Sequence, residues 1–124
     1  DVLERYFFAA LNNRADTIMR ITADCPLIAP DICSGVLALL DGVDYASNVF
    51  PRSVPPGLDC EVFSFDALRR AHQSATDAYD REHVTSWMQR NLRTRALVME
   101  HDYNTTSLCL DTAQDYMRLK ALIE

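Results

Sequence analysis

Two aspartates occur in similar local sequences at distant positions of the 124-residue chain. Asp24 follows the apolar run 21–23, and Asp111 follows the apolar run 108–110. If these runs are neighbouring strands of one sheet, both carboxylates lie at its C-terminal edge, where open α/β sheets bind ligands. Two carboxylates there could share a hard cation such as Mg²⁺, which prefers oxygen ligands. Each aspartate also has a simpler role as a helix cap, which suits Asp111 better than Asp24 because Cys25-Pro26 follows Asp24.

The segment before Asp24 has the composition of a buried strand. β-branched residues occupy positions 17, 18, 21 and 22, and such residues favour strands. Pro26 prevents the backbone pairing from continuing. We therefore expect a strand over residues 15–22 that stops at Asp24 and holds a carboxylate at its end.

Apolar residues recur at helical or strand spacing along the rest of the chain. The pattern predicts helices over residues 2–11, 30–40, 65–74, 80–91 and 112–123, and strands over residues 43–50, 58–63, 95–100 and 107–110. A proline-rich loop, residues 51–57, and a polar loop, residues 101–106, separate some of these elements. Strands that alternate with helices indicate an α/β sandwich.

Several single residues carry local signals. Ser64 is placed to cap the helix that follows it, and either Asp111 or Thr112 caps the final helix. Strand alternation places Asp59 and Glu61 on one face, which must meet solvent or a ligand. The final helix is expected to bury Tyr116, Leu119, Leu122 and Ile123.

The composition is that of one soluble domain. The chain has 48% hydrophobic residues, which is ample for a core, and a formal charge of −6 with scattered basic residues, which argues against nucleic acid as a partner. No apolar run approaches the roughly 20 residues that span a bilayer, so we expect no membrane contact and a cytoplasmic location. The four cysteines form no C-x-x-C pair, which favours buried thiols over zinc or disulfides.

Four motifs in a fixed order resemble one enzyme family. They are residues 20–28 (RITADCPLI), 57–64 (GLDCEVFS), 79–85 (YDREHVT) and 110–116 (LDTAQDY). Together they resemble the cytidylyltransferases of the spore-coat polysaccharide type, which are related to the acylneuraminate and 3-deoxy-sugar-acid cytidylyltransferases. The resemblance covers essentially the whole chain.

The resemblance implies a three-layer, Rossmann-like nucleotide-diphospho-sugar transferase fold with a mixed, mostly parallel sheet. It implies an enzyme that transfers CMP from CTP to a sugar or sugar acid for cell-surface polysaccharide biosynthesis, with pyrophosphate released. In this family the corresponding acids bind the metal, so the catalytic and metal-binding roles carry over to Asp24 and Asp111, with Mg²⁺ as cofactor. A metal clamp there would offset the repulsion between an acidic protein and the phosphates of CTP.

The matched motifs also imply a set of polar residues around the sugar, which comprises Arg20, Arg52, Asp59, Glu61, Arg81, Glu82 and His83. Arginines can grip a carboxylate or phosphate through two hydrogen bonds, and carboxylates can accept sugar hydroxyls. Two alternatives stay open. Residues 80–83 could be a charged helix start with local ion pairs, and Asp59 with Glu61 could be a solvated strand face.

The chain departs from the family pattern in three respects. Ala23 replaces a glycine, and Ala113-Gln114 replaces a Pro-Glu pair. The first strand and the basic, glycine-containing loop that holds the CTP phosphates are not found, and the three glycines form no phosphate-binding pattern. We therefore expect residues 1–124 to be the C-terminal portion of a single nucleotidyltransferase domain. Whether this portion is active by itself stays open. A sheet without its first strand would expose an apolar slot, which predicts a homodimer.

Two other functions stay open from the sequence. The first is a nucleotidyltransferase or glycosyltransferase that uses another nucleotide, because the base-reading loop is the part not found. The second is a non-catalytic dimerisation or interaction module, in which the acids only cap helices and the proline-rich loop contacts a partner. Metal binding that depends on Asp24 and Asp111 distinguishes the enzyme from the module.

Overall fold

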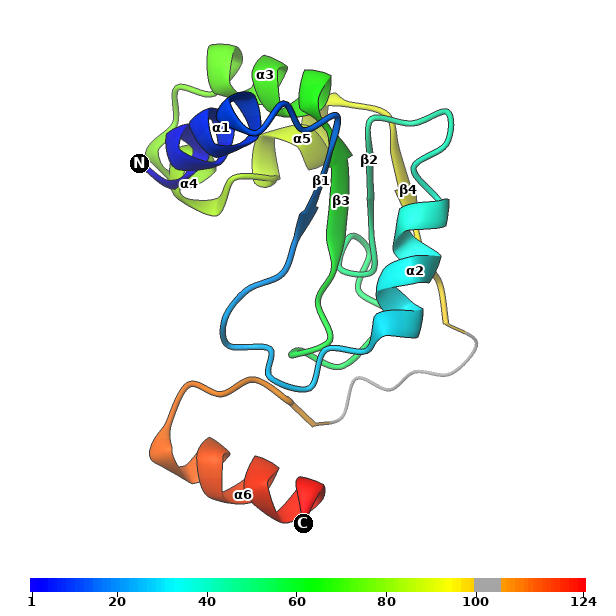
Figure 1. Cartoon of the computed structure of the whole chain (residues 1–124), viewed down its shortest axis with the longest axis vertical. Coiled ribbons are helices and arrows are strands. Elements are labelled where there is room, and N and C mark those ends of the chain that lie inside the picture. The colour runs from blue at the N-terminus through cyan, green and yellow to red at the C-terminus, as the bar shows by residue number, and fades with distance from the viewer. Residues whose placement is uncertain (100–105) are drawn as a thin grey trace.

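The fold was analysed in a computed structural model that describes residues 1–99 and 106–124 (Figure 1). Along the chain the elements are α1 (Val2–Asn12), β1 (Thr17–Arg20), α2 (Pro30–Ala38), β2 (Tyr45–Ser47), β3 (Glu61–Ser64), α3 (Phe65–Ser74), α4 (Ala78–His83), α5 (Ser86–Asn91), β4 (Thr94–Ala96) and α6 (Ala113–Ile123). Residue 100 of a predicted strand and residues 101–105 of the predicted polar loop lie outside the described residues.

The strands form one mixed sheet in the order β1-β3-β2-β4. β3 pairs antiparallel with both β1 and β2, whereas β2 and β4 are parallel. Three of the four described strands therefore run in one direction and β3 opposes them. The predicted α/β class with a mixed sheet is confirmed.

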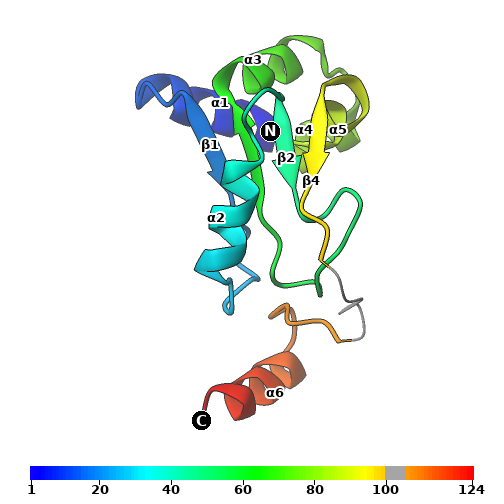
Figure 2. The same ribbon diagram turned by 90° about the vertical axis from the view of Figure 1, so that its right-hand side faces the viewer.

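Helices cover both faces of the sheet. Tyr45 and Phe63, which are partners across β2 and β3, pack on one face with residues of α1, α3 and α5. Ala46 and Val62, the next pair, pack on the other face with Val36 of α2. Figure 2 shows α2 on the opposite side of the sheet from α1 and α3. Alternate residues of the central strands are thus buried in two separate cores, as a three-layer arrangement requires.

The strand before Asp24 is shorter and more exposed than predicted. β1 comprises only Thr17–Arg20, and its residues alternate between exposed and half-buried positions. Within the described part of the chain β1 lies at an edge of the sheet, with β3 as its neighbour. Met19 and Ile21 consequently keep more than a third of their surface exposed. The prediction of a buried strand over residues 15–22 is therefore wrong for this sheet.

The predicted helix over residues 80–91 is divided into α4 and α5 by a turn at Val84. Val84 has φ 65° and ψ −57°, and the Thr85 amide donates to the His83 carbonyl across 2.6 Å. These values define a γ-turn of the rare, strained form, which a β-branched residue seldom adopts. The Val84 side chain is fully buried among residues of α3 and α5, so packing holds the strained backbone in place.

Local caps agree closely with the sequence. The Ser64 hydroxyl accepts from the Ala67 amide and begins α3, as predicted. The Thr112 hydroxyl accepts from the Asp115 amide, and the Asp115 carboxylate accepts in return, which forms a capping box at α6. Thr112 rather than Asp111 is therefore the cap.

The C-terminal region differs from the prediction in two ways. Residues 107–110 do not form a strand. In α6, Leu119 is buried, whereas Tyr116, Leu122 and Ile123 are 55% to 69% exposed and not buried as predicted. No helix among the described residues is long and apolar enough to cross a bilayer.

Candidate functional site

Asp24, Cys109 and Asp111 come together where the loop after β1 meets the segment before α6. One ligand atom from each of these residues lies within 4.8 Å of the others. Asp24 and Cys109 are half-buried, and Asp111 is exposed. The structure thus brings together the two aspartates that the sequence paired, and the Cys109 thiol lies close to both.

The two segments meet through the backbone and not through neighbouring strands. The Leu110 amide donates to the Asp24 carbonyl across 2.9 Å, and the Leu108 amide donates to the Pro56 carbonyl across 2.6 Å. The expectation that Asp111 follows a strand of the sheet is wrong. Residues 107–110 lie across the loops that contain Asp24 and Pro56, and this contact places the Asp111 carboxylate beside Asp24.

Gly57 permits this crossing. Its φ is +102°, and a Cβ atom on it would lie 2.4 Å from the Leu108 carbonyl carbon and 2.7 Å from the Cys109 nitrogen. Real Cβ contacts are never that short, so any side chain at position 57 would push the segment away. Gly57 therefore sets the distance between the proline-rich loop and the segment that carries Asp111.

The environment of Asp24 favours its ionised form. The Thr22 side chain hydrogen-bonds to the Asp24 carboxylate and, with weaker contributions from Cys109 and Cys25, holds its pKa below the usual value. Burial raises the pKa of the Cys109 thiol, and the negative charge of Asp24 adds to that effect. At neutral pH the cluster therefore offers a carboxylate from Asp24 next to a protonated thiol.

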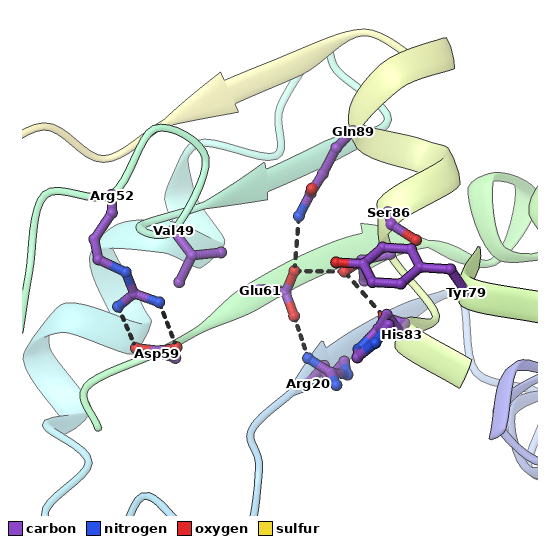
Figure 3. A pocket seen from close by; sticks show the side chains of 10 residues that line it. Arg20, Val49, Arg52, Asp59, Glu61, Tyr79, His83, Ser86 and Gln89 are labelled. Atoms are coloured by element: carbon purple, nitrogen blue, oxygen red, sulfur yellow. Dashed lines mark hydrogen bonds and ion pairs between the residues drawn. The ribbon is translucent and has the colours of Figure 1, made fainter. Parts of the chain in front are cut away.

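A polar cavity of about 180 Å³ lies beside β3 and the α4–α5 corner (Figure 3). It is lined by Arg20, Val49, Arg52, Asp59, Glu61, Tyr79, His83, Thr85, Ser86 and Gln89. Five of the seven residues predicted to lie near the sugar are among them. The γ-turn at Val84 places His83, Thr85 and Ser86 at this cavity by turning the chain between the two helices.

Glu61 lies at the floor of the cavity and is buried. Its Oε1 atom accepts from the Tyr45 hydroxyl at 2.6 Å, from the Thr85 hydroxyl at 2.7 Å and from the Gln89 amide at 3.4 Å. Its Oε2 atom accepts from Arg20 at 2.5 Å. A carboxylate has about four lone-pair sites, so Glu61 is almost fully used by the protein. Its main role is therefore to hold Arg20 in position, and it has little capacity left to accept a hydrogen bond from a ligand.

Burial and the hydrogen-bond network of Glu61 shift the pKa values of Arg20 and Tyr45. Burial, the largest single influence, acts to lower the pKa of Arg20, but the charge and hydrogen bond of Glu61 together with those of Tyr6 outweigh it, and the pKa of the guanidinium is raised. Burial, followed by the charge of Glu61, raises the pKa of the Tyr45 hydroxyl above its usual value. Both groups therefore keep their protons throughout the physiological pH range.

Asp59 connects the cavity with the loop that supports the aspartate pair. Arg52 donates from both Nη atoms to the two oxygens of Asp59, at 2.7 and 2.9 Å. Oδ1 of Asp59 also accepts from the Gly57 amide at 3.3 Å. The cavity and the aspartate cluster thus adjoin each other through residues 57–59.

The structure does not bring Arg81 and Glu82 into the cavity. Arg81 pairs with Asp1 through Nε at 2.6 Å, and its Nη1 donates to the carbonyls of His72 and Ala75. Its guanidinium therefore ties α4 to the end of α3 and to the N-terminus. Glu82 is exposed and is not among the residues that line the cavity.

Several residues that line the cavity are not among those expected from the sequence. Tyr79 and Thr85 lie inside the motif of residues 79–85, whereas Ser86 and Gln89 follow it on α5. The turn at Val84 brings both groups to the cavity, and no local propensity signals that turn. The neighbouring charged pair Asp80 and Arg90 is structural, because Asp80 is buried and bonds to Arg90 at 2.6 Å.

Comparison with known proteins supports the class of the fold. A solved structure of a cytidylyltransferase from Leptospira borgpetersenii serovar Hardjo-bovis matches with a TM-score of 0.93 and 31% identity, over 99% of this chain and 55% of that one. The uncharacterized protein MJ1063 of Methanocaldococcus jannaschii is 38% identical over 93 residues, which are 73% of this chain and 37% of that protein. No protein-family model matches the chain.

These comparisons define the chain at the level of class. It has the Rossmann-like α/β fold seen in a cytidylyltransferase. The chain spans about half the length of that solved structure and just over a third of MJ1063.

Proposed function

We propose that the chain forms the metal- and acceptor-binding part of a cytidylyltransferase. The reaction transfers CMP from CTP to a hydroxyl group of a sugar or sugar acid and releases pyrophosphate, and its product serves cell-surface polysaccharide biosynthesis. The observation that carries this proposal is the approach of Asp24 and Asp111 to within 4.8 Å, next to a polar cavity. A fold shared with a cytidylyltransferase supports the same reaction.

The donor set of the cluster fits Mg²⁺ in part. Asp24 and Asp111 supply carboxylate oxygens, and Mg²⁺ is typically held by one or two carboxylates together with substrate phosphates and waters. Cys109 is a softer donor that Mg²⁺ does not select. When bound, Mg²⁺ would neutralise charge on the phosphate oxygens of the nucleotide. Asp24 and Asp111 would hold it there.

The cavity would bind and orient the acceptor. Glu61 and Asp59 hold the guanidinium groups of Arg20 and Arg52 in fixed directions. Fixed donors cost less entropy when a ligand binds than flexible side chains do. A hydroxyl group bound here can then be presented to the α-phosphate in the in-line geometry that phosphoryl transfer requires.

The proposal is tested with the full-length protein. Pyrophosphate release is measured for each of the four nucleoside triphosphates in the presence of a panel of sugars, with Mg²⁺ or Mn²⁺. We expect CTP to be preferred, and we expect Asp24→Asn and Asp111→Asn each to lower the rate at least about 100-fold. Asp41→Asn changes an exposed acid outside the cluster and should leave the rate unchanged.

The result also separates the other functions. Preference for another triphosphate would indicate a nucleotidyltransferase of different specificity. Direct Mn²⁺ binding that is weak and unaffected by either aspartate variant would contradict the enzyme and favour an interaction module. The homodimer and the cytoplasmic location stay predictions from the sequence.

A further inference from the structure

We propose that the polar cavity accepts a neutral, hydroxyl-rich sugar and excludes a sugar acid. This inference rests on the proposed nucleotidyl transfer and narrows its acceptor class. It is carried by the arrangement of charges around the cavity, which Figure 3 shows as two separate ion pairs.

The first pair joins Arg20 to Glu61 across 2.5 Å at the floor of the cavity. Only 5% of the Glu61 side chain and 20% of the Arg20 side chain are exposed. Tyr45 and Thr85 also hold the carboxylate, so it cannot turn away to release Arg20 without breaking further hydrogen bonds. A ligand carboxylate would have to compete with a partner that is already fixed in place.

The second pair joins Arg52 to Asp59. Both Nη atoms of Arg52 are engaged, one with each oxygen of Asp59, which is the strongest geometry for such a pair. The fork that recognises a carboxylate is therefore occupied by the protein itself. The positive charge of Arg52 is also balanced, and its pKa is raised by the hydrogen bond to Asp59.

The other polar residues of the cavity suit a neutral ligand. Tyr79, Ser86 and Gln89 provide hydroxyl and amide groups, and His83 adds an imidazole next to Tyr79, with ring centroids 4.1 Å apart. The two arginines and two carboxylates sum to zero formal charge. Among the described residues, the lysine or arginine side chains that line the cavity all have a carboxylate partner.

Neutral hydroxyl groups can bind without disturbing either pair. Arg20 donates to Glu61 from Nη1, and its Nε atom is buried without a partner in the described part of the chain, so a sugar oxygen can accept only from the remaining Nη hydrogens. Oxygens of Asp59 retain lone pairs that can accept from a hydroxyl. A site arranged in this way should discriminate against an added negative charge by a large factor.

Matched pairs of ligands test the inference on the full-length protein. Glucose, galactose and mannose are compared with glucuronate, galacturonate and mannuronate, which differ by one carboxylate. Binding is measured by saturation-transfer NMR, and pyrophosphate release is measured with CTP. In both measurements we expect the neutral sugar of at least one pair to be favoured about tenfold or more.

A substitution that changes the charge of the cavity should shift the ligand preference in the opposite direction. Asp59→Asn removes the partner of Arg52 and gives the cavity a net positive charge, so the preference should shift about tenfold towards the uronates. Asp66→Asn breaks an exposed pair with Arg69 on α3 and should change neither preference. An unchanged preference in Asp59→Asn would overturn the inference.

The outcomes separate this inference from the proposed function. A wild-type protein that prefers uronates but releases pyrophosphate overturns the neutral acceptor and keeps the nucleotidyltransferase. A protein that binds neutral hexoses but releases no pyrophosphate with any triphosphate keeps the acceptor class and overturns the reaction. Failure to bind any of the six sugars overturns the neutral acceptor.

Discussion

The carboxylate of Glu61 accepts hydrogen bonds from Tyr45, Thr85, Gln89 and Arg20, which come from different parts of the fold. It therefore joins β3 to β1, to β2 and to the α4–α5 corner. Such a buried network is stable only while each member is satisfied, because an unpaired buried charge is costly. Glu61 thus determines both the shape of the cavity floor and part of the stability of the sheet.

We expect Glu61→Gln to lower the free energy of unfolding by about 3 kcal/mol, since it leaves the partly buried Arg20 without a counter-charge. Urea denaturation monitored by fluorescence of the single tryptophan measures the change. Asp66→Asn, which removes an exposed ion pair, should cost less than about 0.5 kcal/mol. Equal effects of the two substitutions would show that the Glu61 network does not contribute as described.

At the scale of whole elements, one glycine permits the contact between the two segments that carry the aspartate pair. Gly57 lies where residues 107–110 cross the proline-rich loop, and its missing side chain permits the close approach. The crossing brings Cys109 and Asp111 to Asp24. The relative position of Asp24 and Asp111 therefore depends on a glycine that is not itself part of the cluster.

We expect Gly57→Ala to weaken Mn²⁺ binding about tenfold or more, because displacing the crossing segment moves Asp111 away from Asp24. Electron paramagnetic resonance of free Mn²⁺ during a titration of the full-length protein measures this affinity. Gly42 is the matched control: its φ is +77°, but a Cβ there would meet nothing within 4 Å. Gly42→Ala should cost about 1 kcal/mol of stability through strain and leave the affinity unchanged.

The N-terminus of α6 carries a pH-dependent cap. Hydrogen bonds from Arg118 and then from Thr112 lower the pKa of Asp115 from 3.8 to about 2. A carboxylate with a lowered pKa contributes stability above its unfolded pKa, and this contribution is lost as the pH falls through the folded value. The capping box should therefore be intact above about pH 4 and open progressively towards pH 2.

Nuclear magnetic resonance tests this window directly. The Asp115 carboxylate and the Thr112 amide, which donates to it, should titrate together with a midpoint near pH 2. In Asp115→Asn the Thr112 amide should no longer follow this transition. A midpoint for Asp115 near 3.8 would contradict the capping interaction.

At the scale of the whole molecule, α6 leaves much of its apolar surface uncovered. Met117, Leu122 and Ile123 are 66%, 64% and 69% exposed. Ile123 also lines an apolar groove of about 280 Å³, together with Leu110 and Tyr116. Exposed apolar side chains next to an apolar groove are typical of contact with another molecule.

The predicted homodimer can be tested at this surface. We expect the chain to self-associate with increasing concentration in sedimentation equilibrium, and we expect Leu122→Glu combined with Ile123→Glu to weaken the association about tenfold or more. Ala121→Glu places a charge on an exposed position of the same helix and is the control for charge alone. A protein that stays monomeric at high concentration would contradict the prediction.

Local features of the fold could be predicted from the sequence because they depend on neighbouring residues. Ser64 has a hydroxyl that caps the following amides, so α3 begins where predicted. Asp59 and Glu61 both line the cavity, but β3 begins only at Glu61, so strand alternation, as predicted over residues 58–63, does not account for the position of Asp59. The turn at Val84 could not be predicted, because its strained backbone is held by burial and not by local preference.

The sequence by itself determined the class of fold and the two acids that belong together. Only the tertiary structure decided how they meet, because their approach depends on two segments that cross at Gly57 and not on adjacent strands. It also decided that Glu61 is engaged by the protein and that both arginines of the cavity are paired. The Arg20–Glu61 pair joins residues 41 positions apart, and the distance between such residues is set by packing and not by local sequence.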